Sequence, residues 1–385
     1  MEPGHLPGYH RPNHQRHLMK YLKIIRFCAL SFALSPVETG SIIAEDAPVY
    51  SLPLRVTSVS TESPTCKSAE LVEVRKIWDV ADHNAFTDMI YWHEHFFLAF
   101  REGTVHAGSG DVGRVRILRS RDGESWKTAT LIDSTSPQLN DLMGWDTREI
   151  HFSVTPDDRL MLVGMLYQDG AGGTFVAFAD GPDPDDWKNV APQKILDPPW
   201  WLWTTKWRGD TCWGFAYERL PNKDRTYVVH FMKSGNGSDW QRHVSNAINM
   251  GGQSSETAIR FDASGNGFAL SRRNDISALL GKSSGDLKSW TWYDLGDDFK
   301  AFGGPNLIET SYGWIGGGRM HDAGANLSLT AIDVDDPKMH RILKLPSGGD
   351  CSYPGLVWHD NLLYVSYYSS HQGKASIYLA KVKLK

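Results

Sequence analysis

The chain has 385 residues, of which 41% are hydrophobic and 22% charged, and its formal net charge is −5. This composition can bury a core, which excludes global disorder. The negative balance disfavours nucleic acid as a partner, because phosphate binding requires a basic surface. The high counts of Trp (15) and Gly (36), without long helical periodicity, indicate β structure with many turns.

Residues 1–44 are expected to be an upstream extension followed by a signal peptide. Met19 begins the basic stretch MKYLKIIR, and FCALSFALSPV follows as an apolar stretch too short to span a bilayer. Cleavage near Ala44 would give a secreted or periplasmic protein with no membrane segment, whose residues 45–67 form a linker. The three remaining cysteines then make neither a disulfide framework nor a metal site, and at most one pair forms a bridge: Cys66, Cys212 and Cys351.

Four segments after residue 80 share one shape: SRDGESW, ADGPDPDDW, KSGNGSDW and KSSGDLKSW. Each follows a β-rich run, and the distances between their tryptophans are 61, 53 and 50 residues. A repeat of this size is typical of a β-propeller, in which one repeat is one four-stranded blade. The spacing predicts blades at 83–132, 146–196, 200–246, 253–298 and 302–345, with strands at 353–358, 362–368 and 376–384 in the last blade.

The last blade offers only three strands in the C-terminal tail. We expect residues 68–78, SAELVEVRKIW, to supply the fourth strand, because pairing the two ends of the chain closes the ring and removes its edges. The fold class expected for residues 68–385 is therefore an all-β, six-bladed propeller, with seven blades as the alternative count.

The form SRDGESW resembles the Asp-box of sialidase-like propellers, and the resemblance extends in pattern over most of residues 68–385. In a propeller the innermost strands start at one mouth of the central channel, so polar residues at those starts converge from different blades. On this basis we expect the substrate-binding residues Arg101, Arg148, Arg219, Arg272, Arg273, Asn306, Arg319 and His371.

The segments SSETAIRFDASGNGFALSRR and CSYPGL resemble the sialidase blades that carry a Glu, an Arg and the nucleophilic Tyr. This resemblance implies a catalytic pair of Tyr353 and Glu256. Sialidases begin their first blade with an arginine, however, where this chain has HNAFTDMI. An imidazole does not replace a guanidinium that binds a carboxylate through two hydrogen bonds, so the departure disfavours a true sialidase.

The segments DHNAFTD and FREGTVH resemble propeller-type ulvan lyases and rhamnosyl-glucuronate-cleaving propellers. This resemblance implies that His83 and His106 are acid/base residues, and Tyr167 could share the acid role. We expect a carboxylate to hold His83, with Asp82 or Asp88 the nearest in sequence. Histidine titrates closest to neutral pH and therefore suits these proton transfers.

Three functions follow as hypotheses. The first is an enzyme that cleaves a glycosidic bond in an acidic, uronate-containing oligo- or polysaccharide by His and Tyr acid–base chemistry, with arginine binding the carboxylate. The second is a sialidase-type hydrolase using Tyr353 and Glu256, and the third is a propeller that binds glycans without cleaving them. No sequence feature requires a metal or an organic cofactor, and a monomer is expected.

Overall fold

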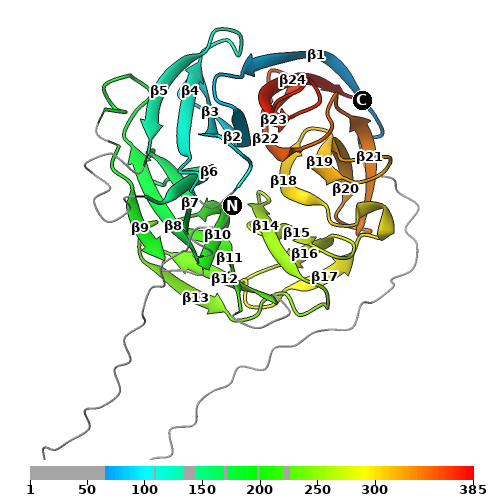
Figure 1. Cartoon of the computed structure of the whole chain (residues 1–385). Helices are drawn as coiled ribbons and strands as arrows, with labels where there is room; N and C mark the ends of the chain where they lie inside the picture. Colours follow the sequence, from blue (N-terminus) through cyan, green and yellow to red (C-terminus); the bar gives the residue numbers. More distant parts are fainter. Residues whose placement is uncertain are drawn as a thin grey trace, which may run out of the picture. The chain divides into compact units, whose positions relative to one another are not determined.

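The structure is a computed structural model that describes residues 66–107, 110–133, 144–168, 171–188, 190–196, 200–220 and 226–385. They form six antiparallel four-stranded sheets, arranged as blades around a central axis (Figure 1). This confirms the predicted all-β propeller and its blade count. The predictions of a leader at 1–44 and a linker at 45–67 lie outside the described residues, apart from Cys66 and Lys67.

The strand bounds follow the predicted repeat closely. Blade one holds β2 (His83–Trp92), β3 (His95–Gly103), β4 (Arg114–Ser120) and β5 (Lys127–Ile132); blade two β6 (Asp146–Val154), β7 (Leu160–Gln168), β8 (Ala171–Ala179) and β9 (Gln193–Leu196); blade three β10 (Trp200–Arg208), β11 (Thr211–Arg219), β12 (Tyr227–Ser234) and β13 (Trp240–Val244). Blade four holds β14 (Ser254–Phe261), β15 (Gly267–Arg273), β16 (Leu279–Ser283) and β17 (Thr291–Asp294); blade five β18 (Gly303–Thr310), β19 (Gly313–Met320), β20 (Asn326–Asp333) and β21 (Lys338–Lys344); blade six β22 (Cys351–His359), β23 (Leu362–Ser369), β24 (Ser376–Leu384) and β1 (Ala69–Trp78).

The position of a strand within its blade explains its sequence. Second strands such as β3, HFFLAFREG, and β7, LMLVGMLYQ, are buried along nearly their whole length and read as continuous apolar runs. Outer strands such as β21, KMHRILK, expose several charged side chains to water. Among the described residues the helical content is slight, and η2 (Asp297–Phe299) is a single 3-10 turn between blades four and five.

The two ends of the propeller close the ring by pairing with each other. β1 runs antiparallel to β24, from Ala69 opposite Leu384 to Trp78 opposite Ile377. This is the pairing predicted for residues 68–78, and it leaves blade six with four strands. Because β1 takes up the free edge of β24, the ring closes through backbone hydrogen bonds as well as side-chain packing.

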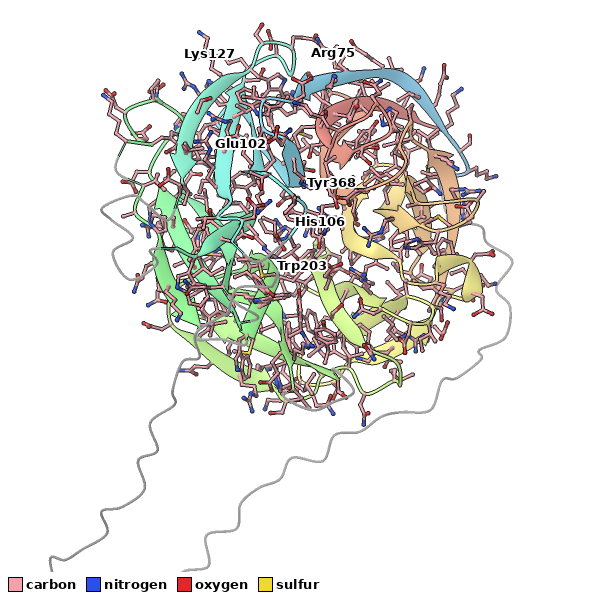
Figure 2. All side chains as sticks on the ribbon, viewed as in Figure 1. Arg75, Glu102, His106, Lys127, Trp203 and Tyr368 are labelled. Atoms are coloured by element: carbon pink, nitrogen blue, oxygen red, sulfur yellow. The ribbon has the colours of Figure 1, made fainter. Side chains whose placement is uncertain are left out.

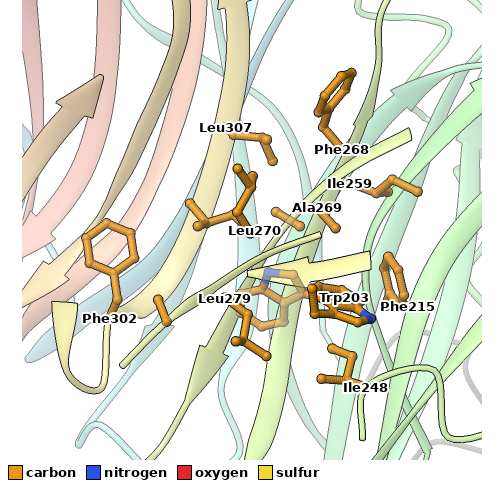
Figure 3. Packing of buried hydrophobic residues seen from close by; sticks show 14 of the residues in the cluster. Trp203, Phe215, Ile248, Ile259, Phe268, Ala269, Leu270, Leu279, Phe302 and Leu307 are labelled. Atoms are coloured by element: carbon orange, nitrogen blue, oxygen red, sulfur yellow. The ribbon is translucent and has the colours of Figure 1, made fainter. Parts of the chain in front are cut away.

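Aromatic side chains fill the spaces between neighbouring blades. Trp187 of blade two stacks on Phe97 of blade one at 5.0 Å between ring centroids. Trp290 of blade four packs edge-on against Phe231 of blade three at 5.2 Å. Figure 3 shows the largest such cluster, in which Trp203 and its neighbours from blades three to five interdigitate.

Hydrogen bonds near the axis join successive blades. The Asp88 carboxylate of blade one accepts from Phe152 N of blade two at 3.0 Å, and Ile259 N of blade four donates to Thr204 Oγ1 of blade three at 3.0 Å. These bonds fix the inner strands relative to one another, which a site assembled from several blades requires.

The structure shows the state of the three cysteines in the propeller. Cys66, Cys212 and Cys351 are all buried, and none forms a disulfide. In the part of the chain that the structure describes, no helix has the length and apolar character needed to cross a bilayer.

Candidate functional site

The inner strand of every blade carries a β-bulge at the same position, near the mouth where the strand begins. At each bulge the register with the second strand gains one extra residue, so two residues oppose one. The bulge residues are Phe86–Thr87, Arg148–Glu149, Trp203–Thr204, Ser255–Glu256, Gly304–Pro305 and Tyr353–Pro354.

The bulges turn side chains toward the axis. Phe86 and Tyr353 adopt left-handed backbone conformations, with φ of 62° and 53°, that are costly for large side chains. Tyr353 of blade six lies 5.3 Å from Trp203 of blade three, on the other side of the ring. Contact between such distant blades shows that both rings lie at the axis. This ring of bulges is the scaffold of the candidate site.

Tyr353 and Glu256 form the first pair at the axis. The Tyr353 hydroxyl donates a hydrogen bond to Glu256 Oε1 at 2.7 Å. Arg272 Nη1 donates to both oxygens of the same carboxylate at 3.0 Å, and Gly304 N donates to Oε2 at 2.8 Å. Three blades therefore hold the Glu256 carboxylate in one orientation.

Opposite pKa shifts accompany this arrangement. Burial alone would raise the pKa of Glu256, but Arg272, the Tyr353 hydroxyl and Gly304 N together lower it, so the carboxylate is ionised. Burial and the charges of Glu256 and Glu149 raise the pKa of Tyr353 well above its ordinary value. The pair is therefore a neutral phenol bonded to an ionised carboxylate, which can accept the phenol proton.

His83 and His106 form a second group with Asp350. His83 Nε2 lies 2.8 Å and His106 Nδ1 2.7 Å from the same oxygen, Asp350 Oδ2, and Tyr368 donates to Oδ1 at 3.0 Å. An ionised carboxylate only accepts hydrogen bonds, so both imidazoles donate to it. A neutral His106 then has its Nε2 lone pair free as a base. Figure 2 shows His106 and Tyr368 near the centre of the ring, whereas Arg75 and Lys127 lie at its edge.

Electrostatics keep Asp350 charged. Burial opposes ionisation of Asp350, but the hydrogen bonds from His106 and His83 hold its pKa well below its usual range. His106 is half-exposed, whereas His83 is largely covered. Of the two histidines, His106 is therefore the one that a substrate in the channel can reach.

Phe86 connects the two groups. Its ring lies 5.0 Å from those of both His106 and Tyr353. The Tyr353–Glu256 pair and the histidine–Asp350 group thus flank one aromatic side chain, which places a phenol, a carboxylate and an imidazole around one small volume.

The histidine group is also the place where a metal could bind. His83 Nε2, His106 Nδ1 and an Asp350 oxygen lie within 4.8 Å of one another, and they are the one such set found among the described residues. Two imidazoles and a carboxylate are a common donor set for divalent transition metals. The short contacts to Asp350 are, however, fully explained as hydrogen bonds to a carboxylate, and His83 Nδ1 has no partner there to support a metal ligand.

Blade two adds a second buried carboxyl. Burial raises the pKa of Glu149, an effect that Arg148 and His151 only partly offset. Arg148 donates from Nε to Asp146 Oδ2 at 2.8 Å, and its guanidinium lies 4.2 Å from the centre of the Tyr167 ring. Tyr167 is therefore at this mouth, but it is covered by Arg148 on one face.

Two arginines from blades four and five have donors to spare. Nε of Arg272 and Nε of Arg319 are buried and find no hydrogen-bond partner among the described residues. Arg319 Nη1 makes one long contact, 3.5 Å, with Cys351 O. Arg319, which forms no ion pair among the described residues, is suited to binding a carboxylate at this mouth, whereas Arg272 is already paired with Glu256.

Three of the predicted substrate-binding residues do not reach the channel. Arg101 is fully buried in the wall, where it bonds to Asp146 Oδ1 at 2.8 Å and Asp111 Oδ2 at 2.7 Å. Arg273 faces away from Arg272, because neighbours on a strand alternate, and bonds to Ser277 O at 2.6 Å and to Asp294.

Asn306 is the third correction. It is 3% exposed, accepts from Arg260 at 2.8 Å and donates to Pro354 O at 2.9 Å, so it joins blades four, five and six. The polar groups of all three side chains form hydrogen bonds within the protein. Reading each of them as a substrate contact was wrong.

Two further predicted residues lie at or just beyond the ends of second strands and, within the described part of the chain, form no hydrogen bond or ring contact with the Tyr353 or His106 groups. His371 sits in the turn after β23, where Nδ1 bonds to Ser369 Oγ at 2.9 Å and the ring lies 4.9 Å from that of Tyr378. Arg219 ends β11 and is exposed. The partner of His83 is also corrected: it is Asp350, while Asp88 bonds to blade two and Asp82 is exposed.

The site contains residues that sequence reasoning missed. They are Asp350, Tyr368, Phe86 and Trp203. Asp350 had a usable signal, because it precedes the first strand of blade six by one residue and so had to lie at the mouth. Phe86 and Trp203 had none, because their inward direction depends on bulges that the sequence does not mark.

Comparison with solved structures places the fold. A protein of unknown function from Dyadobacter fermentans aligns with a TM-score of 0.66 at 16% identity, covering 83% of this chain and 100% of its own. A Fusarium graminearum α-L-arabinofuranosidase variant with an iminosugar inhibitor gives 0.61 at 10% identity, covering 83% and 98%. Trypanosoma rangeli sialidase in complex with sialic acid gives 0.57 at 10% identity, covering 81% of this chain and 58% of its own.

The fold is a sialidase-like β-propeller. The chain spans little more than half the length of the trypanosomal sialidase, and the identities support likeness in fold alone. No protein-family model and no curated protein sequence matches the chain.

Proposed function

We propose that the protein hydrolyses a glycosidic bond in an acidic glycan, with Tyr353 as nucleophile. The observation that carries this proposal is the 2.7 Å hydrogen bond from the Tyr353 hydroxyl to the ionised Glu256 carboxylate at the axis. A phenol with a raised pKa is a poor nucleophile unless a base takes its proton as the new bond forms. Glu256 is placed for that transfer.

The first step forms a bond between the Tyr353 oxygen and the anomeric carbon. The Tyr353 proton passes to Glu256 Oε1, and the bond to the departing sugar breaks with its electron pair on the leaving oxygen. A protonated His106 supplies the proton to that oxygen. Water then attacks the anomeric carbon, and His106 accepts its proton. The bond between that carbon and the Tyr353 oxygen breaks with its electron pair on the oxygen, to which Glu256 returns the proton.

Arginine explains why the substrate would be acidic. Arg319 forms no ion pair with a carboxylate among the described residues, and its Nη1 makes only one long hydrogen bond, 3.5 Å to Cys351 O. A sugar carboxylate at this place would pair with its guanidinium, and partial burial would strengthen that bond. The sialidase and arabinofuranosidase of similar fold are glycosidases, which agrees with a carbohydrate substrate.

A second candidate reaction is β-elimination from a uronate. The observation that favours it is the His106–Asp350 bond, which leaves His106 Nε2 free to remove the C5 proton. In this reaction Tyr353, neutral because of its raised pKa, would protonate the leaving oxygen.

The test is the product formed from a panel of uronate polysaccharides and sialosides. Hydrolysis gives a new reducing end without an unsaturated, ultraviolet-absorbing product, whereas elimination gives both. Retention on the same glycans without any product would show a binding protein and overturn the proposed enzyme.

A further inference from the structure

The loop that follows β3 carries His106, and a largely covered aspartate holds this loop in place. Asp111 Oδ2 accepts a hydrogen bond from Arg101 Nη2 at 2.7 Å and one from Val105 N at 3.1 Å. Its other oxygen, Oδ1, accepts from Thr104 N at 3.1 Å and from Thr104 Oγ1 at 3.0 Å. Both oxygens of Asp111 are therefore bonded to the residues that immediately precede His106.

The anchor behind this loop is the tightly enclosed guanidinium of Arg101. A Cβ added at Gly103 would lie 2.2 Å from Arg101 Nη1, and one added at Gly113 would lie 2.2 Å from Nε. The guanidinium thus lies between two backbone segments that only glycine allows to approach so closely. From this position Nη1 also donates to Val105 O at 2.9 Å, and Nε donates to Asp146 Oδ1 at 2.8 Å.

The contacts of Asp111 go beyond neutralising Arg101. Burial would raise the pKa of Asp111, but hydrogen bonds from Arg101, Thr104 N and Val105 N lower it to about 2, so the carboxylate is ionised. One oxygen is sufficient for the ion pair, and Asp146 already pairs with the same guanidinium. The second oxygen, Oδ1, bonds to Thr104 and so contributes to the position of the loop.

His106 itself has few contacts that could fix its ring. The side chain is half-exposed, and within the described part of the chain the ring forms one hydrogen bond, from Nδ1 to Asp350 at 2.7 Å. The rings of Phe86 and His83 approach it at 5.0 and 5.5 Å. Ordering two or three backbone residues costs about as much free energy as one charge-assisted hydrogen bond returns. The bond to Asp350 therefore needs a loop that Asp111 has already ordered.

We infer that Asp111 is a positioning residue for His106. It fixes the loop against Arg101, so that His106 Nδ1 meets Asp350 while Nε2 stays free. Asp111 acts through this loop and not on the reacting atoms. The inference rests on the proposed function for the proton transfers of His106, whereas the position of the ring can be measured without a substrate.

The tautomer of His106 reports this position. A neutral ring whose Nδ1 donates to Asp350 is the Nδ1–H form, whereas the Nε2–H form predominates in a free histidine side chain. Long-range ¹H–¹⁵N NMR of the histidine-labelled protein distinguishes the two forms at a pH where the ring is neutral, and His106→Asn assigns the signal. We expect at least about nine-tenths Nδ1–H in the wild type and less than about half in Asp111→Ala.

A conservative variant and a matched control accompany this measurement. Asp111→Asn keeps one acceptor oxygen and should give a fraction between those of the wild type and Asp111→Ala. The control is Asp122→Ala, in the turn between β4 and β5 of the same blade. Asp122 also accepts from backbone groups, Glu124 N and Ser125 N, both at 2.8 Å, but its turn carries no residue of the site. This variant should leave the tautomer of His106 unchanged.

Kinetics add a readout that is specific to proton transfer. On a glycan that the wild type cleaves, Asp111→Ala should lower kcat/KM about 10²-fold, because the leaving oxygen needs a proton. On the 2,4-dinitrophenyl glycoside of the same sugar, whose leaving group needs no proton, kcat/KM should stay within about threefold. A general defect of the fold would lower both values equally.

Three results would overturn the inference: a wild-type tautomer in Asp111→Ala, an equal change of tautomer in Asp122→Ala, or an equal fall in kcat/KM on both substrates. If Asp111→Ala does not fold, a wild-type tautomer in Asp111→Asn overturns it. Failure of the proposed hydrolysis would appear separately, as absence of cleavage by a wild-type protein in which His106 has the expected tautomer.

Discussion

His83 and Asp350 are separated by 267 residues of sequence, yet His83 Nε2 lies 2.8 Å from Asp350 Oδ2. The contact joins the start of blade one to the residue just before blade six, next to the place where β1 closes the ring. His106 reaches the same oxygen from the end of β3. One carboxylate thus orients both histidines of the candidate site.

Replacing Asp350 with Asn tests this orientation. An amide carries no negative charge, and its nitrogen cannot accept the bond from Tyr368, so the group loses the anion that holds both imidazoles and fixes the tautomer of His106. We expect kcat/KM on a cleaved glycan to fall about 10²–10⁴-fold, the usual range for a positioned proton-transfer group, with an unchanged circular dichroism spectrum. The His83→Ala substitution should lower kcat/KM by a factor in the same range.

The matched control is Asp82→Asn, which changes the exposed carboxylate next to His83 in sequence. It should retain wild-type kcat/KM. If Asp82→Asn abolished cleavage and Asp350→Asn did not, the assignment of Asp350 would be wrong.

Removal of divalent metals separates the two readings of the histidine group. If His83, His106 and Asp350 act through hydrogen bonds, prolonged treatment with a chelator should leave kcat/KM within about twofold. Added Co²⁺ should then produce no visible absorption that depends on His106. Loss of activity restored by one particular metal would show instead that the group binds that metal.

The buried Arg101 should contribute to the stability of the fold and not directly to catalysis. Arg101→Met would leave the covered Asp111 without a cation and Asp146 with Arg148 alone, which costs about 3–5 kcal/mol of unfolding free energy. Arg219→Met, at an exposed strand end, should change it by less than about 0.5 kcal/mol. Equal urea midpoints for the two variants would contradict the structural role of Arg101.

Lys206 should make stability depend on pH. Burial and the charge of Arg260 together lower its pKa to about 7 in the folded state, against the opposing charge of Asp88. His151 contacts the same Asp88, Cys212 also lies nearby, and Lys206 Nζ donates to Phe152 O at 3.0 Å. The unfolded chain, with an ordinary lysine pKa near 10.5, therefore binds more protons between these values.

This difference in proton binding sets the direction in which stability changes with pH. The contribution of Lys206 to the free energy of unfolding increases as pH rises from about 7 to about 10, because folding then no longer has to release the Lys206 proton. Relative to Lys206→Met, the wild-type protein should become more stable over this window in urea titrations. Parallel curves for the two proteins would contradict the lowered pKa.

The blades were predictable because each repeats one pattern of strands and a Trp-bearing turn. The closing role of residues 68–78 followed from the missing fourth strand of the last blade. Glu256, Arg272 and Tyr353 could also be placed at one mouth, because strand starts and ends in a propeller converge there.

The individual contacts could not be predicted in the same way. Arg101 and Arg319 occupy equivalent registers on second strands, opposite Ala85 and Gly303 respectively. One is sealed in the wall by Asp146 and the other faces the mouth, and that difference depends on a side chain from the next blade. The bulges add one residue to each inner strand and so change which side chains face the axis.

The rate of glycan cleavage by Tyr353→Phe tests the central claim most directly. The control is Tyr367→Phe, another buried tyrosine, whose hydroxyl donates to Pro346 O at 2.9 Å. If Tyr353 is the nucleophile that Glu256 deprotonates, Tyr353→Phe should lose at least about 10²-fold in kcat while Tyr367→Phe stays within about threefold of wild type. Wild-type kcat in a folded Tyr353→Phe protein would contradict the proposed hydrolysis.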